Sequence, residues 1–117
     1  MAEYTLTKSG ELARVLEVAG PLEHRDATRF RDQLDQFVVE SSAKPVIVDL
    51  SALELISSAC MRLLVQFQRA LEKIGVKMIT VGLRGTAREA MEITGMTTLL
   101  ETAPSLEDAV GKLGTPA

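Results

Sequence analysis

The chain has few of the side chains that form disulfides, metal sites or active sites. Cys60 is its only cysteine and His24 its only histidine. One thiol excludes an internal disulfide, and these two residues provide too few ligands for a zinc site of the usual kind. The sequence also has no glycine-rich phosphate loop, no Gly-x-Ser-x-Gly motif and no paired-carboxylate motif. We therefore expect no metal, no cofactor and no enzymatic activity.

Aromatic residues are also scarce, basic residues are scattered, and long apolar runs are absent from the sequence. Aromatic residues make up 3% of the chain, and the formal net charge is −3. Nucleic-acid-binding proteins usually show a basic stripe or stacking aromatic residues, so direct nucleic-acid binding is not expected. The apolar stretches are too short to cross a bilayer, and the N-terminus lacks the basic-then-apolar pattern of a signal peptide. These patterns predict no membrane insertion and a cytoplasmic location.

The chain does contain the elements of one α/β domain. Its 117 residues, 46% of them apolar, predict a single domain over residues 1–117 with an aliphatic core. Hydrophobic periodicity predicts strands at 3–8, 12–18, 46–49, 76–81 and 97–100, and helices at 26–40, 58–74, 84–93 and from 105 onward. The first two strands form a predicted hairpin with a turn at 9–11. The order predicts a mixed β-sheet of about five strands with four helices.

Local signals mark several ends of these elements. Gly20 and Pro21 are expected to end the second strand. Ser105 and Asp108 have the spacing of a capping box at the start of the last helix.

The helix predicted at 58–74 carries the most informative pattern. With Cys60 at zero and about 100° per residue, one arc gathers the predicted core side chains Cys60, Leu63, Leu64, Phe67, Leu71 and Ile74. The opposite side gathers Ser58, Met61, Arg62, Val65 and Arg69. We therefore expect Ser58 to point away from the sheet, beside exposed Met61 and Val65. Such a cluster indicates a small contact patch, although single apolar residues are also common on protein surfaces.

Two segments resemble the signature of STAS domains, and within them the bacterial anti-sigma-factor antagonists. The first is Val-Asp-Leu-Ser at 48–51, and the second is Ile-Ser-Ser-Ala-Cys-Met-Arg at 56–62. The turn at 20–23 also resembles the Gly-x-Leu-Asp turn before the first helix of that family. The predicted order of strands and helices matches the STAS fold, so the resemblance covers nearly the whole chain.

The resemblance implies a phosphorylation switch at Ser58. In the family, the unphosphorylated protein binds an anti-sigma factor, often a serine kinase, and thereby frees a sigma factor for transcription. The kinase phosphorylates the serine, the complex dissociates, and a metal-dependent serine phosphatase resets it. This chain departs from the family pattern at four neighbouring positions: Ser57 replaces aspartate, Ala59 serine, Cys60 glycine and Met61 leucine.

Each of these residues also has a purely structural interpretation. Ser58 can be an ordinary helix-start serine, Ser57 an N-cap, and Glu23 either a neighbour of the acceptor or a solvated residue. We expect His24 at the surface and Cys60 as a small buried apolar side chain. The predicted partner-binding residues are Glu23, Ser57, Ser58, Met61, Arg62, Val65 and Arg69. The regulatory interpretation requires the Ser58 hydroxyl, Met61 and Val65 to face outward.

Two other functions stay open at this stage. A STAS domain that does not switch could serve as an accessory subunit of a lipid transporter or as a scaffold in a signalling assembly, binding its partner constitutively. A sensor of a small molecule or nucleotide could use the turn around Glu23 together with Ser57 and Ser58.

Overall fold

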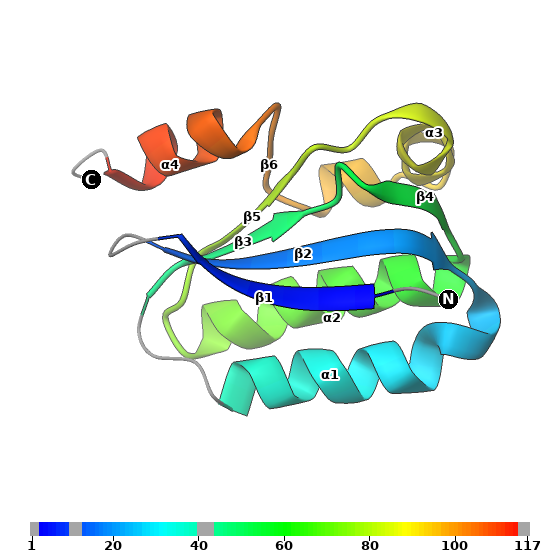
Figure 1. The fold of residues 1–117 in the computed structure, drawn as a ribbon, viewed down its shortest axis with the longest axis horizontal. Helices are drawn as coiled ribbons and strands as arrows, with labels where there is room; N and C mark the ends of the chain where they lie inside the picture. The colour runs from blue at the N-terminus through cyan, green and yellow to red at the C-terminus, as the bar shows by residue number, and fades with distance from the viewer. Residues whose placement is uncertain (1–2, 10–12, 40–43, 115–117) are drawn as a thin grey trace.

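Six strands form one mixed sheet within residues 3–9, 13–39 and 44–114, the part of the chain that the computed structural model describes (Figure 1). The strands are β1 (Glu3–Ser9), β2 (Ala13–Leu22), β3 (Val46–Asp49), β4 (Leu53–Ile56), β5 (Met78–Val81) and β6 (Thr102–Ala103). The order across the sheet is β1-β2-β3-β5-β6, and β4 pairs with β2. Only the β1–β2 pair is antiparallel among these strands.

Within the same described residues, four α-helices and two short 3-10 helices lie between the strands or after the last of them. They are η1 (His24–Asp26), α1 (Ala27–Val39), α2 (Ser58–Lys73), α3 (Gly85–Ile93), η2 (Met96–Thr98) and α4 (Leu106–Gly114). The mixed α/β architecture and the antiparallel hairpin are as predicted. Residues 10 and 11 of the predicted turn, and residue 12 of the predicted second strand, lie outside the described residues.

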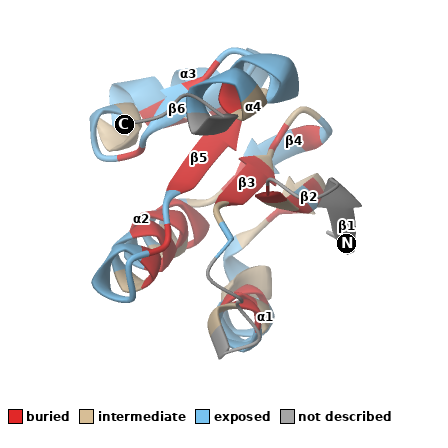
Figure 2. Cartoon of the chain, turned by 90° about the vertical axis from the view of Figure 1, so that its left-hand side faces the viewer, coloured by how far each residue is buried: buried red, intermediate tan, exposed pale blue. Residues whose placement is uncertain are grey.

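The two faces of the sheet are covered by different helices (Figure 2). Alternation along β2 places Leu16 and Val18 on the face that α1 and α2 cover, and Ala13 and Val15 on the other. The larger core lies under α1 and α2, which pack side by side. The smaller core lies under α4, where Ala109 is fully buried.

The end of β2 differs from the prediction. The strand continues through Gly20 and Pro21 to Leu22 because β4, which the sequence analysis missed, pairs with it there. Gly20 has φ 79°, a conformation that glycine adopts without strain, and the register shifts between Gly20 and Pro21. Gly20 and Pro21, which were expected to end β2, therefore lie within the strand and only shift its register.

The strand predicted at 97–100 is wrong. Gly95 adopts φ 76° and begins η2 instead, so this segment turns rather than extends. The buried Gln68 side chain then holds the following loop: its Nε2 donates to the Leu99 carbonyl at 3.1 Å, and its Oε1 accepts from the Glu101 N–H at 2.9 Å. The last strand forms only after this loop, as the two-residue β6.

The predicted spacing at the last helix places Ser105 as a side-chain cap, which forms the first of the two bonds of a capping box. The Ser105 Oγ accepts from the Asp108 N–H at 3.2 Å and donates to the Asp108 carboxylate at 3.0 Å. Polar groups at the start of α4 are thereby satisfied by local side chains.

Candidate functional site at the start of α2

The candidate site is built where β4 ends and α2 begins. The Ser57 N–H donates to the Leu22 carbonyl at 2.8 Å, which ties this point to the end of β2. Ser57 has extended backbone angles, and its Oγ accepts from the Cys60 N–H at 3.2 Å. Ser57 is therefore the N-cap of α2, as predicted.

Ser58 is the first residue of α2, and its side chain is exposed. Because Ser57 caps the helix, the Ser58 hydroxyl is not needed for that purpose, and it makes no hydrogen bond with any residue that the structure describes. The expectation that Ser58 points away from the sheet is confirmed.

The apolar part of the predicted patch is wrong. Met61 is 2% exposed and Val65 is 5% exposed, and both belong to the larger core. Ile74, which was predicted in the core, is 55% exposed, and Leu63 is only partly buried. The buried arc of α2 is therefore rotated from the predicted one, away from Leu63 and Ile74 and toward Met61 and Val65.

A second set of contacts explains this rotation. The helix packs against the sheet, but its flank also meets the segment that follows α3. The Thr94 hydroxyl lies 3.5 Å from the Met61 sulfur, and Gln68 binds the loop after η2. A pattern read from one helix cannot show that a neighbouring element covers its flank, and sequence reasoning missed these contacts.

The charged members of the predicted site remain at the surface. Arg62 and Arg69 are exposed, and neither forms an ion pair with another residue in the described part of the chain. Arg62 lies one helical turn from Ser58. Arg69 lies eleven residues along the helix, about 16 Å at 1.5 Å per residue, so it shares the face without reaching the hydroxyl.

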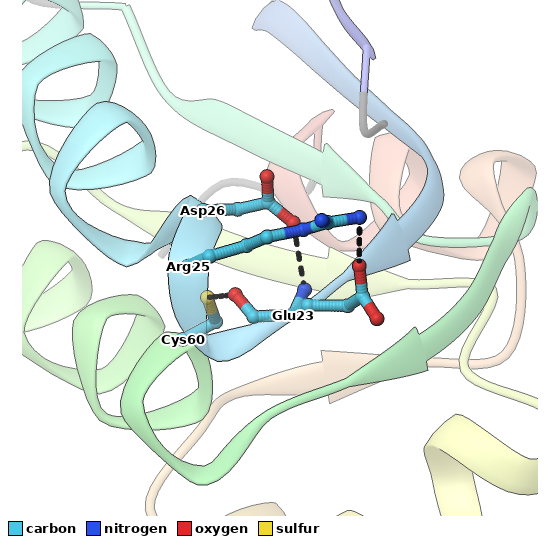
Figure 3. A network of polar contacts seen from close by, with 4 residues as sticks. All are labelled: Glu23, Arg25, Asp26 and Cys60. Atoms are coloured by element: carbon cyan, nitrogen blue, oxygen red, sulfur yellow. Dashed lines mark hydrogen bonds and ion pairs between the residues drawn. The ribbon is translucent and has the colours of Figure 1, made fainter.

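The backbone of Glu23 lies close to the start of α2, next to Cys60 (Figure 3). The Cys60 thiol is 3.6 Å from the Glu23 carbonyl oxygen, and the Glu23 N–H donates to the Asp26 carboxylate at 2.9 Å. The Glu23 carboxylate pairs with Arg25 at 2.8 Å. The backbone of Glu23 thus contacts α2, while its charge is partly neutralised by the neighbouring arginine.

Cys60 and His24 have the environments expected of them. His24 is exposed, and Cys60 is fully buried. Burial raises the pKa of the Cys60 thiol above its ordinary value; the hydrogen bond with Ser57 lowers it, and the charge of Asp26 raises it further. The thiol is therefore a protonated core side chain rather than an activated nucleophile.

A metal site, a ligand pocket or a membrane-spanning helix among the described residues would suggest a different function. No three His, Cys, Asp or Glu side chains gather there in a way that could hold a metal ion. A hollow of about 250 Å³ at the ends of β3 and β5 is lined by Asp49, Ser51 and Arg84 among others, and by none of the predicted site residues. Within the same described ranges, no helix combines the length and apolar character that crossing a membrane requires.

The family model of the STAS domain matches residues 4–109. Comparison with curated protein sequences finds no match.

Several solved structures share the whole fold. An anti-sigma factor antagonist from Mycobacterium paratuberculosis is 23% identical, with a TM-score of 0.81, and the match covers 98% of this chain and 96% of that one. The anti-sigma factor antagonist SpoIIAA in its unphosphorylated form is 18% identical, with a TM-score of 0.77 and coverage of 98% and 100%. The Bacillus cell fate determinant SpoIIAA in the phosphorylated form is 18% identical, with a TM-score of 0.67 and coverage of 94% and 98%.

Proposed function

The chain belongs to the STAS domain family, and from that premise we propose that it is an anti-sigma-factor antagonist switched at Ser58. The unphosphorylated chain binds an anti-sigma factor of the serine-kinase type, and phosphorylation of Ser58 releases it. A serine phosphatase then restores the binding form. The role of the chain in this cycle is binding and not catalysis. Structures of anti-sigma factor antagonists with the same fold support the general role.

The observation that carries the proposal is that two adjacent serines at the start of α2 have different roles. Ser57 caps α2, and Ser58 presents an exposed hydroxyl without a hydrogen-bonding partner among the described residues. A kinase can reach such a hydroxyl without disrupting the helix. In the proposed transfer, the γ-phosphoryl group of ATP forms a bond to the Ser58 Oγ, ADP leaves, and the hydroxyl proton passes to a base of the kinase.

The charge of the phosphate accounts for release. A phosphoserine carries nearly two negative charges at neutral pH. At the first residue of a helix this charge is tolerated within the chain, because backbone N–H groups there carry partial positive charge. In a closed interface the same charge must lose water, which is costly unless the partner offers a counter-charge. The modification should therefore weaken binding far more than folding.

The structure changes the surface that we propose for the partner. Met61 and Val65 are buried, so we no longer include them in this surface. Exposed apolar side chains of α2 therefore do not contribute to the proposed partner contact. The proposed surface consists of the remaining predicted residues Glu23, Ser57, Ser58, Arg62 and Arg69. It is polar, and its α2 face carries two arginines, which suits a partner with acidic groups.

Isothermal titration calorimetry tests this function with anti-sigma factors of the serine-kinase type from the organism that encodes this chain. We expect Ser58→Ala to bind as the unmodified chain does, and Ser58→Glu to bind at least tenfold more weakly. Incubation with the kinase that binds and with Mg-ATP should add one phosphate to the unmodified chain and none to Ser58→Ala, as measured by mass spectrometry.

Thr86→Glu is the matched control, because Thr86 is an exposed hydroxyl residue in the first turn of another helix, α3. This variant should retain its affinity. Equal affinity of Ser58→Ala and Ser58→Glu would refute the switch and favour the second candidate, a STAS domain that binds its partner constitutively. Stabilisation of the chain by nucleotides in a thermal-shift experiment would instead favour a sensor.

A further inference from the structure

The face of α2 that carries Ser58 also carries one arginine within reach of it. Ser58 and Arg62 are both exposed and lie four residues apart in an unbroken helix, whose first backbone bond joins the Met61 N–H to the Ser57 carbonyl at 2.9 Å. Side chains at i and i+4 of a helix are neighbours, with Cβ atoms about 5–6 Å apart. A long guanidinium side chain easily spans that distance.

Arg62, like Arg69, forms no ion pair with another residue in the described part of the chain, unlike Arg25 and Arg88. Arg25 pairs with Glu23 at 2.8 Å, and Arg88 pairs with Glu92 at 3.2 Å. Arg62 has no such ion pair or hydrogen bond within residues 3–9, 13–39 and 44–114.

The positions next to Arg62 on the helix also lack an acid. Its neighbours three and four residues away are Ser58, Ala59, Val65 and Gln66. Arg69, by contrast, has Glu72 three residues away. The only position at these spacings around Arg62 that can acquire a negative charge by phosphorylation is Ser58. The order of the pair, with the acidic group N-terminal to the basic one, is also the favourable order in a helix.

A cation near Ser58 would stabilise a phosphate there further, beyond the effect of the helix N-terminus. The segment packed against the start of α2 contains Glu23 and Asp26, and the charge of Asp26 is felt at Cys60, two residues from Ser58. Arg25 is occupied by Glu23, and the remaining residue of η1, His24, is exposed. Arg62 is therefore the arginine of α2 that lies one helical turn from Ser58.

We propose that Arg62 binds the phosphate of phosphorylated Ser58 within the same chain. The contact, a charge-assisted hydrogen bond, stabilises the dianionic phosphate. It also engages Arg62, so that the modification both adds negative charge to the partner-binding surface and removes one positive charge from it. This inference rests on the proposed function for the modification itself, but the contact can be tested without a kinase or a partner.

The test uses chains synthesised with phosphoserine at position 58. The phosphate is titrated by ³¹P NMR in the unmodified background and in the variants Arg62→Gln, Arg62→Lys and Arg69→Gln. Arg62 should favour the dianion, so Arg62→Gln should raise the phosphate pKa by about 0.3 unit, since i,i+4 pairs contribute a few tenths of a kcal/mol and one unit is 1.36 kcal/mol. Arg62→Lys should restore part of the difference.

Arg69→Gln is the matched control, because it removes an exposed arginine from the same face of the same helix beyond the reach of the phosphate. It should leave the phosphate pKa unchanged. His24 is present in every chain, so any effect of its protonation cancels in the comparison. An equal pKa in the unmodified and Arg62→Gln backgrounds, or an equal shift in Arg69→Gln, would overturn the inference. Neither result bears on whether Ser58→Glu loses the partner, so the two proposals fail separately.

Discussion

Met61 and Ile93 show at the residue scale how little side-chain chemistry alone says about location. Both are large apolar residues on helices, yet Met61 is 2% exposed and Ile93 is 86% exposed. The difference arises from the neighbours of each residue. Met61 is covered by the core and by Thr94, whereas Ile93 ends α3 and projects into solvent.

Truncation of these two residues should therefore have unequal effects. Met61→Ala should lower the free energy of unfolding by about 2–4 kcal/mol, because it leaves a cavity in the larger core. Ile93→Ala should change it by less than about 0.5 kcal/mol, as surface substitutions usually do. Urea denaturation measures both. Similar values for the two variants would contradict the placement of Met61 in the core.

The buried thiol of Cys60 predicts a pH dependence of stability. Its pKa is raised in the folded chain, mainly because burial disfavours the charged form. Above pH 9.0, the ordinary value, the unfolded chain loses the thiol proton while the folded chain keeps it. The stabilising contribution is thus complete below pH 9.0 and declines as pH rises toward the folded pKa.

Cys60→Ala removes this dependence while leaving the other titrating groups in place. Unfolding free energies of both chains, measured from pH 7 to pH 10.5, should differ by a constant amount up to about pH 8.5. Above that, the unmodified chain should lose stability faster, by at most about 1.4 kcal/mol per pH unit. Parallel curves throughout would show that the thiol titrates alike in both states.

At the residue scale, the sequence predicted the cap at Ser57 and the exposure of Ser58 correctly. Both depend on chain-local properties: a hydroxyl at a helix start, and a period of 3.6 residues. The burial of Met61 and Val65 could not be predicted, because it depends on the contacts beside α3 and η2, which are distant in sequence.

At the scale of a single element, α2 depends on its cap. The Ser57 Oγ satisfies the Cys60 N–H, which would otherwise lack a partner at the helix start. Ser57→Ala should therefore lower the free energy of unfolding by about 1 kcal/mol, and Ser57→Asp should retain it, because aspartate caps equally well. Chemical denaturation provides the measurement.

Ser58→Ala is the control for this prediction, since the Ser58 hydroxyl has no partner among the described residues. It should change stability by less than about 0.5 kcal/mol. If Ser58→Ala were as destabilising as Ser57→Ala, the assignment of cap and free hydroxyl to these two serines would have to be reversed.

Elements with a clear hydrophobic pattern of their own were predicted well, whereas β4 and β6 were not. The helix at 58–74 and the strand at 46–49 agree with α2 and β3 to within one residue. By contrast, β4 and β6 are four and two residues long, and each forms because a neighbouring strand or a buried side chain positions it. Because these contacts involve residues that are distant in sequence, a local sequence pattern does not predict β4 and β6.

At the scale of the whole molecule, the alternation of strands and helices was sufficient to predict the fold class. It did not show how unequally the two faces of the sheet are covered. The face under α1 and α2 carries the larger core, whereas α4 fully buries only Ala109 among its described side chains. Val110 packs only partly against the smaller core.

This inequality predicts that α4 opens more easily than the rest of the fold. Local opening requires less free energy where few apolar contacts are lost, so amides of 106–112 should exchange with deuterium faster than those of α2.

Ala109→Asp places a charge in the smaller core and should accelerate exchange in α4 further. Gly111→Asp is the matched control, because a side chain at Gly111 would meet open space, and it should leave exchange nearly unchanged. Hydrogen-exchange mass spectrometry resolves these segments. Equal protection of α4 and α2 in the unmodified chain would contradict this prediction. It would mean that α4 opens only together with the larger core, so that the number of buried side chains does not determine which helix opens first.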